Sequence, residues 1–176
     1  MVFQIDVVPE RIAIKYKGVF DFGALYKMMR AWFEEREFDF DEGRYKHKEK
    51  DIGAEIEIDW RAYRSVTEVF QERFHIHFHM WDIREVEIVK EGKKKKVFKG
   101  RLMIEIKGII DLDYENQFEG SFVKEKWRNF LVDFIYRRDI DTIWGDRLWY
   151  VAHKLQQRIK LFLQMESHSD VYDDMW

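Results

Sequence analysis

Apolar and polar residues alternate over long stretches of this chain, and the alternation predicts β-strands. Between residues 54 and 62 every even-numbered position is apolar and every odd-numbered position is charged. Apolar residues occupy most even-numbered positions again in 66–80 and 98–112. Successive side chains of a strand point to opposite faces, so a shared phase indicates one antiparallel sheet with an apolar face and a polar face.

Two further segments complete the expected sheet. "RIAIKYK" (11–17) alternates and predicts a strand, whereas "RYKHKEKD" (44–51) is polar on both faces and predicts an edge strand protected by lysines. Residues 65–73 leave an alternative open, because Ser65 and Glu68 form a capping-box pair that also fits a short helix. We favour the strand for this segment.

Apolar residues recur at helical spacing in three other places, and Asp or Thr precedes two of them as a candidate N-cap. The predicted helices are 22–36 after Asp21, 122–137, and 143–165 after Asp141 or Thr142. Strands mixed with helices in this order predict an α+β fold, in which a strongly curved antiparallel sheet of about five to six strands is packed on one face by three helices.

The chain has 176 residues, a net charge of -3 and no cysteine. We expect a single domain over 1–166, without disulfides, followed by an acidic, mobile tail over 167–176. No apolar run is long enough to predict a membrane span, no secretion signal is evident, and charges of both signs are interspersed, so we expect a cytoplasmic protein without general nucleic-acid binding. Abundant Lys, Arg and Glu without Cys is typical of high-temperature growth.

Charge pairing suggests a register for the expected strands, because facing residues of an antiparallel pair should be compatible. Val89 paired with Val97 faces Glu87 with Lys99 and Phe78 with Gly108. For the preceding hairpin, pairing Tyr63 with Thr67 across a turn at 64–66 is consistent with the alternation. Together these registers predict two rows across the polar face, Glu57–Arg73–Asp113 and Glu55–His75–Asp111.

Two features predict that the sheet bends. A straight strand of about 15 residues at about 3.3 Å each would be near 50 Å long, which is too long for a domain of this size. The chosen register also places Asp82 and Arg84 on the apolar face, which predicts a β-bulge near 82–84.

The segment "RFHIHFHMWD" (73–82) places three histidines at alternate positions. One interpretation is a ladder of cross-strand ion pairs on the wet face of the sheet. The other is a His-x-His metal site with zinc or iron, because residues two apart on a strand can converge on one ion and a carboxylate can complete the set. The candidate ligands are His75, His77, Asp111 and Glu55.

The polar face becomes apolar toward the hairpin, which suggests a partner surface. A protein partner or a second copy could contact Trp81, Ile83 and Met103, beside Val89 and Val97. Four lysines follow in the expected turn, namely Lys93, Lys94, Lys95 and Lys96. They are either a solvated turn or a contact for an acidic partner or a nucleic-acid backbone.

The order strand, helix, antiparallel strands and long C-terminal helix resembles the helix-grip architecture of lipid-transfer and polyketide-cyclase-like proteins. The resemblance rests on element order, and this chain has one helix rather than two after the first strand and an extra helix before the last. It implies an apolar cavity between the sheet and the C-terminal helix. The candidate lining residues are Trp60, Phe70, Phe78, Ile106 and Leu155.

These observations favour a binding or interaction module without catalytic activity, which could enclose an apolar small molecule between the curved sheet and the C-terminal helix. No cofactor is expected for that function. The alternative is a metal-dependent enzyme that uses the His-x-His and carboxylate site on the sheet face. Phosphate-loop, zinc-protease and nucleophile-elbow motifs are absent from the sequence.

Overall fold

The structure is a computed structural model that describes residues 3–7, 11–67, 70–90, 93–112, 114, 126 and 140–165. Within them lie six strands and two α-helices, which confirms an α+β protein with an antiparallel sheet. The strands are β1 (Phe3–Asp6), β2 (Ile12–Phe20), β3 (Asp39–Lys48), β4 (Ala54–Ser65), β5 (Phe70–Lys90) and β6 (Lys93–Leu112). The α-helices are α1 (Phe22–Glu34) and α4 (Asp146–Phe162), and a π-helical segment (Ile140–Gly145) precedes α4.

The strands form one sheet in which β6, β5, β4 and β3 follow one another and every pair is antiparallel. Strands β1 and β2 lie end to end along the other side of β6, because β1 pairs with Ile109–Leu112 and β2 with Phe98–Ile106. Strand β3 is an edge strand and is mostly exposed, as predicted, but it covers Asp39–Lys48 rather than 44–51.

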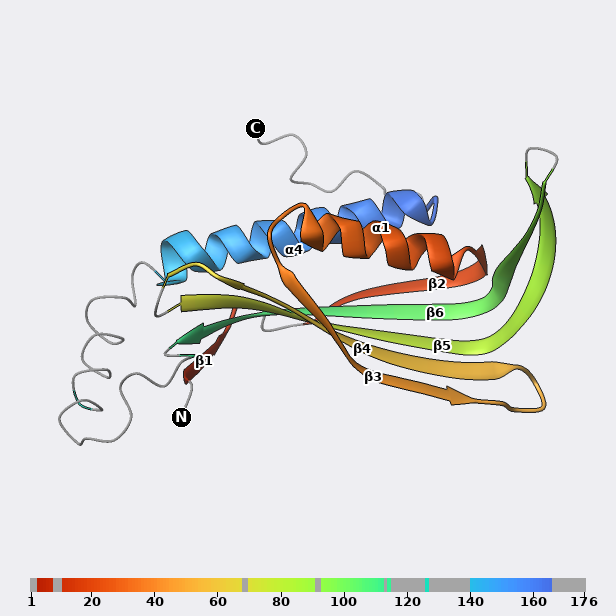
Figure 1. Cartoon of the computed structure of the whole chain (residues 1–176), viewed down its shortest axis with the longest axis horizontal. Helices are drawn as coiled ribbons and strands as arrows, with labels where there is room; N and C mark the ends of the chain where they lie inside the picture. Colours follow the sequence, from red (N-terminus) through yellow and green to blue (C-terminus); the bar gives the residue numbers. More distant parts are fainter. Residues whose placement is uncertain are drawn as a thin grey trace.

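The two longest strands, β5 and β6, curve strongly at the end that carries their turn, toward the side on which the helices lie (Figure 1). A β-bulge accompanies this bend: Gly100 of β6 stands opposite two residues of β5, Asp82 and Ile83. Asp82 has a positive φ of 55°. The bend and the bulge near 82–84 are therefore confirmed.

Both helices cover one face of the sheet (Figure 1). Helix α1 begins where predicted, and the Asp21 side chain accepts a hydrogen bond from the backbone N–H of Ala24 at 3.0 Å. Helix α4 begins at Asp146 with Gly145 as N-cap and no side-chain capping bond, so the expected cap at Asp141 or Thr142 is wrong. The π-helical segment already carries the chain in helical form through those two positions.

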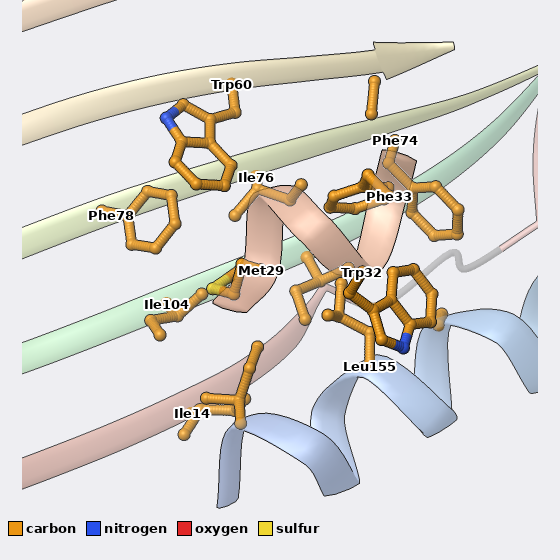
Figure 2. Packing of buried hydrophobic residues seen from close by; sticks show 14 of the residues in the cluster. Ile14, Met29, Trp32, Phe33, Trp60, Phe74, Ile76, Phe78, Ile104 and Leu155 are labelled. Carbon is orange, nitrogen blue, oxygen red and sulfur yellow. The ribbon is translucent and has the colours of Figure 1, made fainter. Parts of the chain in front are cut away.

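The even-numbered residues of β4, β5 and β6 fill the space between the sheet and the two helices, as the alternation predicts. Figure 2 shows Trp60, Phe74 and Phe78 from the sheet near Phe33 of α1 and Leu155 of α4. Each of these side chains is at most 1 % exposed. Burial of large apolar side chains on both layers is the main stabilising contribution to the fold.

One charged residue, Glu72, is buried on this apolar face and is only 2 % exposed. Its carboxylate accepts a hydrogen bond from Arg64 Nη2 at 2.5 Å, and Arg147 Nε of α4 lies 3.9 Å away. Arg64 also donates to the backbone oxygen of Arg36 at 2.9 Å. The ion pair therefore links β4, β5, α4 and the end of α1.

The predicted strand registers are wrong. Val97 pairs with Val86 rather than with Val89, and Gly108 pairs with Phe74 rather than with Phe78. Only residues 91 and 92 separate the last pair of the hairpin, so its turn is much tighter than a seven-residue loop. In the preceding hairpin the register is displaced by six residues. Glu57 faces His79, Asp59 faces His77 and Arg61 faces His75.

Other predictions fall partly outside the described residues. The helical alternative for 65–73 is wrong where it can be compared, because Phe70–Arg73 belongs to β5. The helix predicted over 122–137 and the tail over 167–176 lie outside the described residues, as does position 113 of the predicted rows. Within the described part, the helices on the sheet number two rather than three.

Candidate functional site

The face of the sheet opposite the two helices carries a groove of about 790 Å³ that is lined by residues of β1, β3, β4, β5 and β6 and by Arg11, just before β2. Its charged lining comprises five cationic side chains and two carboxylates. The lining residues are Gln4, Arg11, Arg44, Asp59, Trp60, Arg61, Arg73, His75, Ile76, His77, Met103, Glu105, Lys107 and Ile109. The three histidines of β5 lie on this face, and their neighbours differ sharply from one to the next.

His79 lies in a row of carboxylates. It stands opposite Glu57, and its Nε2 atom lies 2.8 Å from Glu55 Oε1. Lys50 and His79 hold the pKa of the Glu55 carboxyl down at about 2, chiefly through the hydrogen bond from Lys50. Lys46 in the same way lowers the pKa of Glu57.

Ligand atoms of Glu55, Glu57 and His79 all lie within 4.8 Å of one another, which is close enough for one metal ion. Three cations surround the same carboxylates: Lys50 contacts Glu55, while Lys46 and Arg44 contact Glu57. A divalent ion would have to displace these side chains. The Glu55–Glu57–His79 cluster thus has the donor set of a metal site, but its charge is already compensated by the protein.

His77 also has a carboxylate partner. Its Nδ1 atom lies 2.5 Å from Asp59 Oδ1, and Glu105 stands opposite on β6. Glu105 in turn accepts a hydrogen bond from Arg11 at 2.7 Å. His77 and His79 therefore each lie within hydrogen-bond distance of a carboxylate on β4, which is the cross-strand arrangement of the ladder interpretation.

His75 is different because cations flank it on both neighbouring strands. Arg61 stands opposite on β4 and Lys107 stands opposite on β6. Burial lowers the pKa of His75, and the charges of Arg73 and Arg61 lower it further. Among the described residues His75 has no hydrogen-bond partner, so its ring nitrogens are free for a ligand.

The predicted metal ligands are spread along this face. His75 and His77 are neighbours on β5, but Glu55 lies at the other end of the row, beside His79. Asp111 is fully buried and forms an ion pair of 2.5 Å with Arg73. Burial raises the pKa of Asp111, while Arg73 opposes that shift. The structure therefore brings His75 near one predicted carboxylate, Asp111, and leaves Glu55 apart.

The predicted cavity residues lie in the core on the other face. Trp60, Phe70, Phe78, Ile106 and Leu155 are all buried and belong to one hydrophobic cluster. The rings of Trp60 and Phe78 are 4.8 Å apart and Tyr26 lies 4.5 Å from Trp60, so aromatic contacts occupy the space next to them.

The predicted partner patch is rearranged by the bulge. Ile83 and Val97 are 5 % and 4 % exposed, so these two side chains are buried rather than presented to a partner. The extra residue at the bulge turns Ile83 to the opposite side, where it joins the core cluster. Trp81 remains half-buried, with its ring tilted by 35° against that of His79 and the two centroids 3.8 Å apart, and Met103 lines the groove.

The hairpin lysines make local ion pairs. Lys94 lies 3.9 Å from Glu87 and Lys96 lies 3.5 Å from Glu85, with all four side chains well exposed. Lys95 pairs with Asp21 at the start of α1. The side chain of Lys93 lies outside what the structure describes. These pairs resemble a solvated turn with one link to the helix, and a contact with an acidic partner stays a prediction.

Arg61 and Lys107 are absent from the site predicted by sequence, although they flank His75. The alternation already places both residues on the polar face. Their proximity to His75 depends on the register, which charge pairing did not reveal. A histidine with a cation on each neighbouring strand is an arrangement that a search for pairs of opposite charge rejects.

Within the described residues, no helix has the length and apolar character needed to span a membrane. Comparison of the chain with protein-family models and with curated proteins finds no match, so the geometry of the sheet face carries the functional argument.

Proposed function

We propose that this protein is a binding module without catalytic activity, and that its ligand occupies the groove on the helix-free face of the sheet. The observation that carries the proposal is the groove itself, whose volume of about 790 Å³ lies in the range of small-molecule sites. Its walls combine two half-buried histidines and four arginines, of which three are exposed, with the apolar side chains of Met103 and Ile109.

The arrangement of the sheet supports this choice. The other face is already filled by α1 and α4, whose buried residues pack against Ile76, Phe78 and Ile104. An apolar ligand between the sheet and α4 would have to displace such core contacts, and packed interiors resist that. The groove needs no such rearrangement, because its lining side chains already border open space.

We also propose that the arrangement is helix-grip-like in its broad form. The support is that the curved sheet carries the long helix α4 along its inner face, with α1 beside it (Figure 1). In such an arrangement a carrier would bind its ligand between sheet and helix. The residues predicted to line that cavity belong to the hydrophobic core, and we propose that the ligand binds on the opposite face.

A screen of small molecules by ligand-observed NMR tests the groove. The set contains anionic, cationic, neutral polar and apolar compounds at equal concentration. We expect at least one class to bind, and Met103→Trp to abolish binding by filling the groove. Val89→Trp is the matched control, because Val89 is 72 % exposed at the hairpin end of the same sheet. We expect this control to bind normally.

Two results would contradict the proposal. One is a set of binders that all survive Met103→Trp, which would locate binding elsewhere. The other is a change in the mass of the bound compound after incubation, which would indicate an enzyme rather than a binding module.

A metal-dependent function is the second candidate, and the observation that favours it is the Glu55–Glu57–His79 cluster. Calorimetry with zinc on protein purified without a metal column tests it. We expect tight binding that His79→Ala abolishes and His75→Ala leaves intact if the cluster is a metal site. Failure of zinc to bind at all would leave these residues as ion-pair partners of Lys46 and Lys50.

A further inference from the structure

We infer that the groove binds a small molecule through an oxyanion group, a phosphate or a carboxylate, held by Arg61, His75 and Lys107. This inference rests on the proposed function, because it names the ligand class of the same groove.

The three side chains form one direct row across neighbouring strands, since Arg61 faces His75 and His75 faces Lys107. Strands of a sheet are about 4.8 Å apart, so the row spans only about 10 Å. Arg73 lies two residues from His75 on the same strand and the same face, which is a separation of about 7 Å. Cationic residues on three neighbouring strands therefore lie beside His75 on this face of the sheet.

Ion pairs within the protein neutralise only some of the cations around His75. Arg73 is paired with Asp111 at 2.5 Å, and Lys107 lies 3.0 Å from Asp6. Arg61 has no ion-pair partner among the described residues, even though Asp41 stands opposite it on β3. The guanidinium of Arg61 is thus free to make a bidentate contact with an incoming oxyanion.

The neighbouring rows show that the arrangement is specific to His75. In the described part of the sheet, the row of His77 contains Asp59 and Glu105, and the row of His79 contains Glu57. Carboxylates flank both of those histidines, whereas cations flank His75 on both sides. The electrostatic field at this one row therefore favours an anion. Burial is the main cause of the lowered pKa of His75, and the charges of Arg73 and Arg61 add to it.

The size and the wider surface argue for a small molecule rather than a nucleic acid. A volume of about 790 Å³ matches a compound of drug size. Asp59 and Glu105 line the same groove in the next row, beside His77, and the chain has a net charge of -3, so a polyphosphate backbone that extends beyond the row of His75 would meet repulsion.

Isothermal titration calorimetry with pyrophosphate and with citrate tests the inference and separates the two sources of the oxyanion. We expect at least one of them to bind, and Arg61→Ala and Lys107→Ala each to weaken its binding at least tenfold. Lys99→Ala is the matched control, because it removes the same charge from β6 well away from the groove, and its affinity should stay within twofold of the parent protein. Circular dichroism confirms that each variant is folded.

Three outcomes would overturn the inference. One is that neither anion binds. Another is that binding persists unchanged in Arg61→Ala and Lys107→Ala. The third is that Lys99→Ala weakens binding as much as they do, which would indicate attraction to net charge alone.

The small-molecule screen separates this inference from the proposed function. If the screen finds groove binders that are only cationic or neutral, the oxyanion assignment fails while the proposed function stands. If no compound binds the groove, both fail.

Discussion

Arg61 lies directly opposite His75 across β4 and β5, on the sheet face that the described helices leave open. A cation facing an imidazole disfavours protonation of the ring, so this pair does not stabilise the fold as an ion pair would. The next two histidines along β5 face carboxylates instead. Arg61 and His75 line the groove and gain no stability from an ion pair with each other. We therefore expect a ligand to supply the missing negative charge at this position.

The pKa of His75 should lie below the ordinary value of about 6.5, first because of burial and then because of Arg73 and Arg61. His75 then binds a proton more tightly in the unfolded chain than in the folded protein, so protonation favours unfolding. The contribution of His75 to the free energy of unfolding is therefore fully present above a pH of about 6.5 and is lost as the pH falls below that value. NMR titration of the ring signals measures this pKa, and Arg61→Gln should raise it. A midpoint at or above 6.5 in the parent protein, or no change in the variant, would contradict the geometry.

Sequence alternation predicted which residues face the core, but it could not fix the registers. The register proposed for β4 and β5 differs from the observed one by six residues, and that for the inner part of β5 and β6 differs by four. Both are even displacements. Because side chains repeat every two residues, an even slip leaves every residue on its correct face, and the apolar pattern cannot detect it. The length of the turn decides the register of a hairpin, and the turn lengths predicted for both hairpins are wrong.

Gly100 is required by the bulge. An added Cβ would lie 2.6 Å from Ile83 Cδ1 and 2.7 Å from the backbone oxygen of Trp81, which is too close. We expect Gly100→Ala to lower the free energy of unfolding by about 1–3 kcal/mol, as overpacking does. Urea denaturation measures the change. Gly43→Ala is the matched control, since its Cβ would contact only the Arg61 side chain at 3.6 Å; equal losses in the two variants would contradict this role of Gly100.

The buried pair Arg64–Glu72 should respond differently to single and double substitution. Glu72 is 2 % exposed, so Arg64→Met leaves its charge without its main partner, and we expect a loss of about 3–5 kcal/mol in the free energy of unfolding. Arg147, at 3.9 Å, compensates only in part.

The double variant Arg64→Met with Glu72→Met removes both buried charges and should be clearly more stable than the single variant. Thermal and urea denaturation of both proteins make the comparison. If the double variant were as unstable as Arg64→Met, the loss would come from packing around Arg64 and not from an uncompensated charge.

Glu55 should titrate at about pH 2, because Lys50 and then His79 donate hydrogen bonds to its carboxylate. A lowered folded pKa means that this group stabilises the protein above its unfolded pKa of about 4.3 and loses that contribution as the pH falls toward 2. Carbon-detected NMR of the Glu55 carboxyl gives the midpoint. Lys50→Ala should move it upward, whereas Lys15→Ala, at an exposed position of β2, should not. An ordinary midpoint in the parent protein would contradict the Lys50–Glu55–His79 arrangement.

The candidate site was predictable only in outline. Alternation placed His75, His77 and His79 together on the polar face, and the structure agrees. It could not say that His75 differs from the other two, because that depends on which residues of β4 and β6 lie beside it. The buried position of Ile83 was missed for a related reason, since one extra residue at the bulge reverses the alternation beyond it.

The most direct measurement is an NMR titration of the parent protein with pyrophosphate, in which the ring signals of the three histidines and the methyl signals of Ile14 and Leu155 are followed together. Ile14 and Leu155 lie in the core between the sheet and α4, while the histidines report on the open face. We expect the largest change at His75, a smaller one at His77, and none at the two methyl groups. Changes centred on Ile14 and Leu155, with His75 unaffected, would place the ligand between the sheet and α4 and contradict binding in the groove.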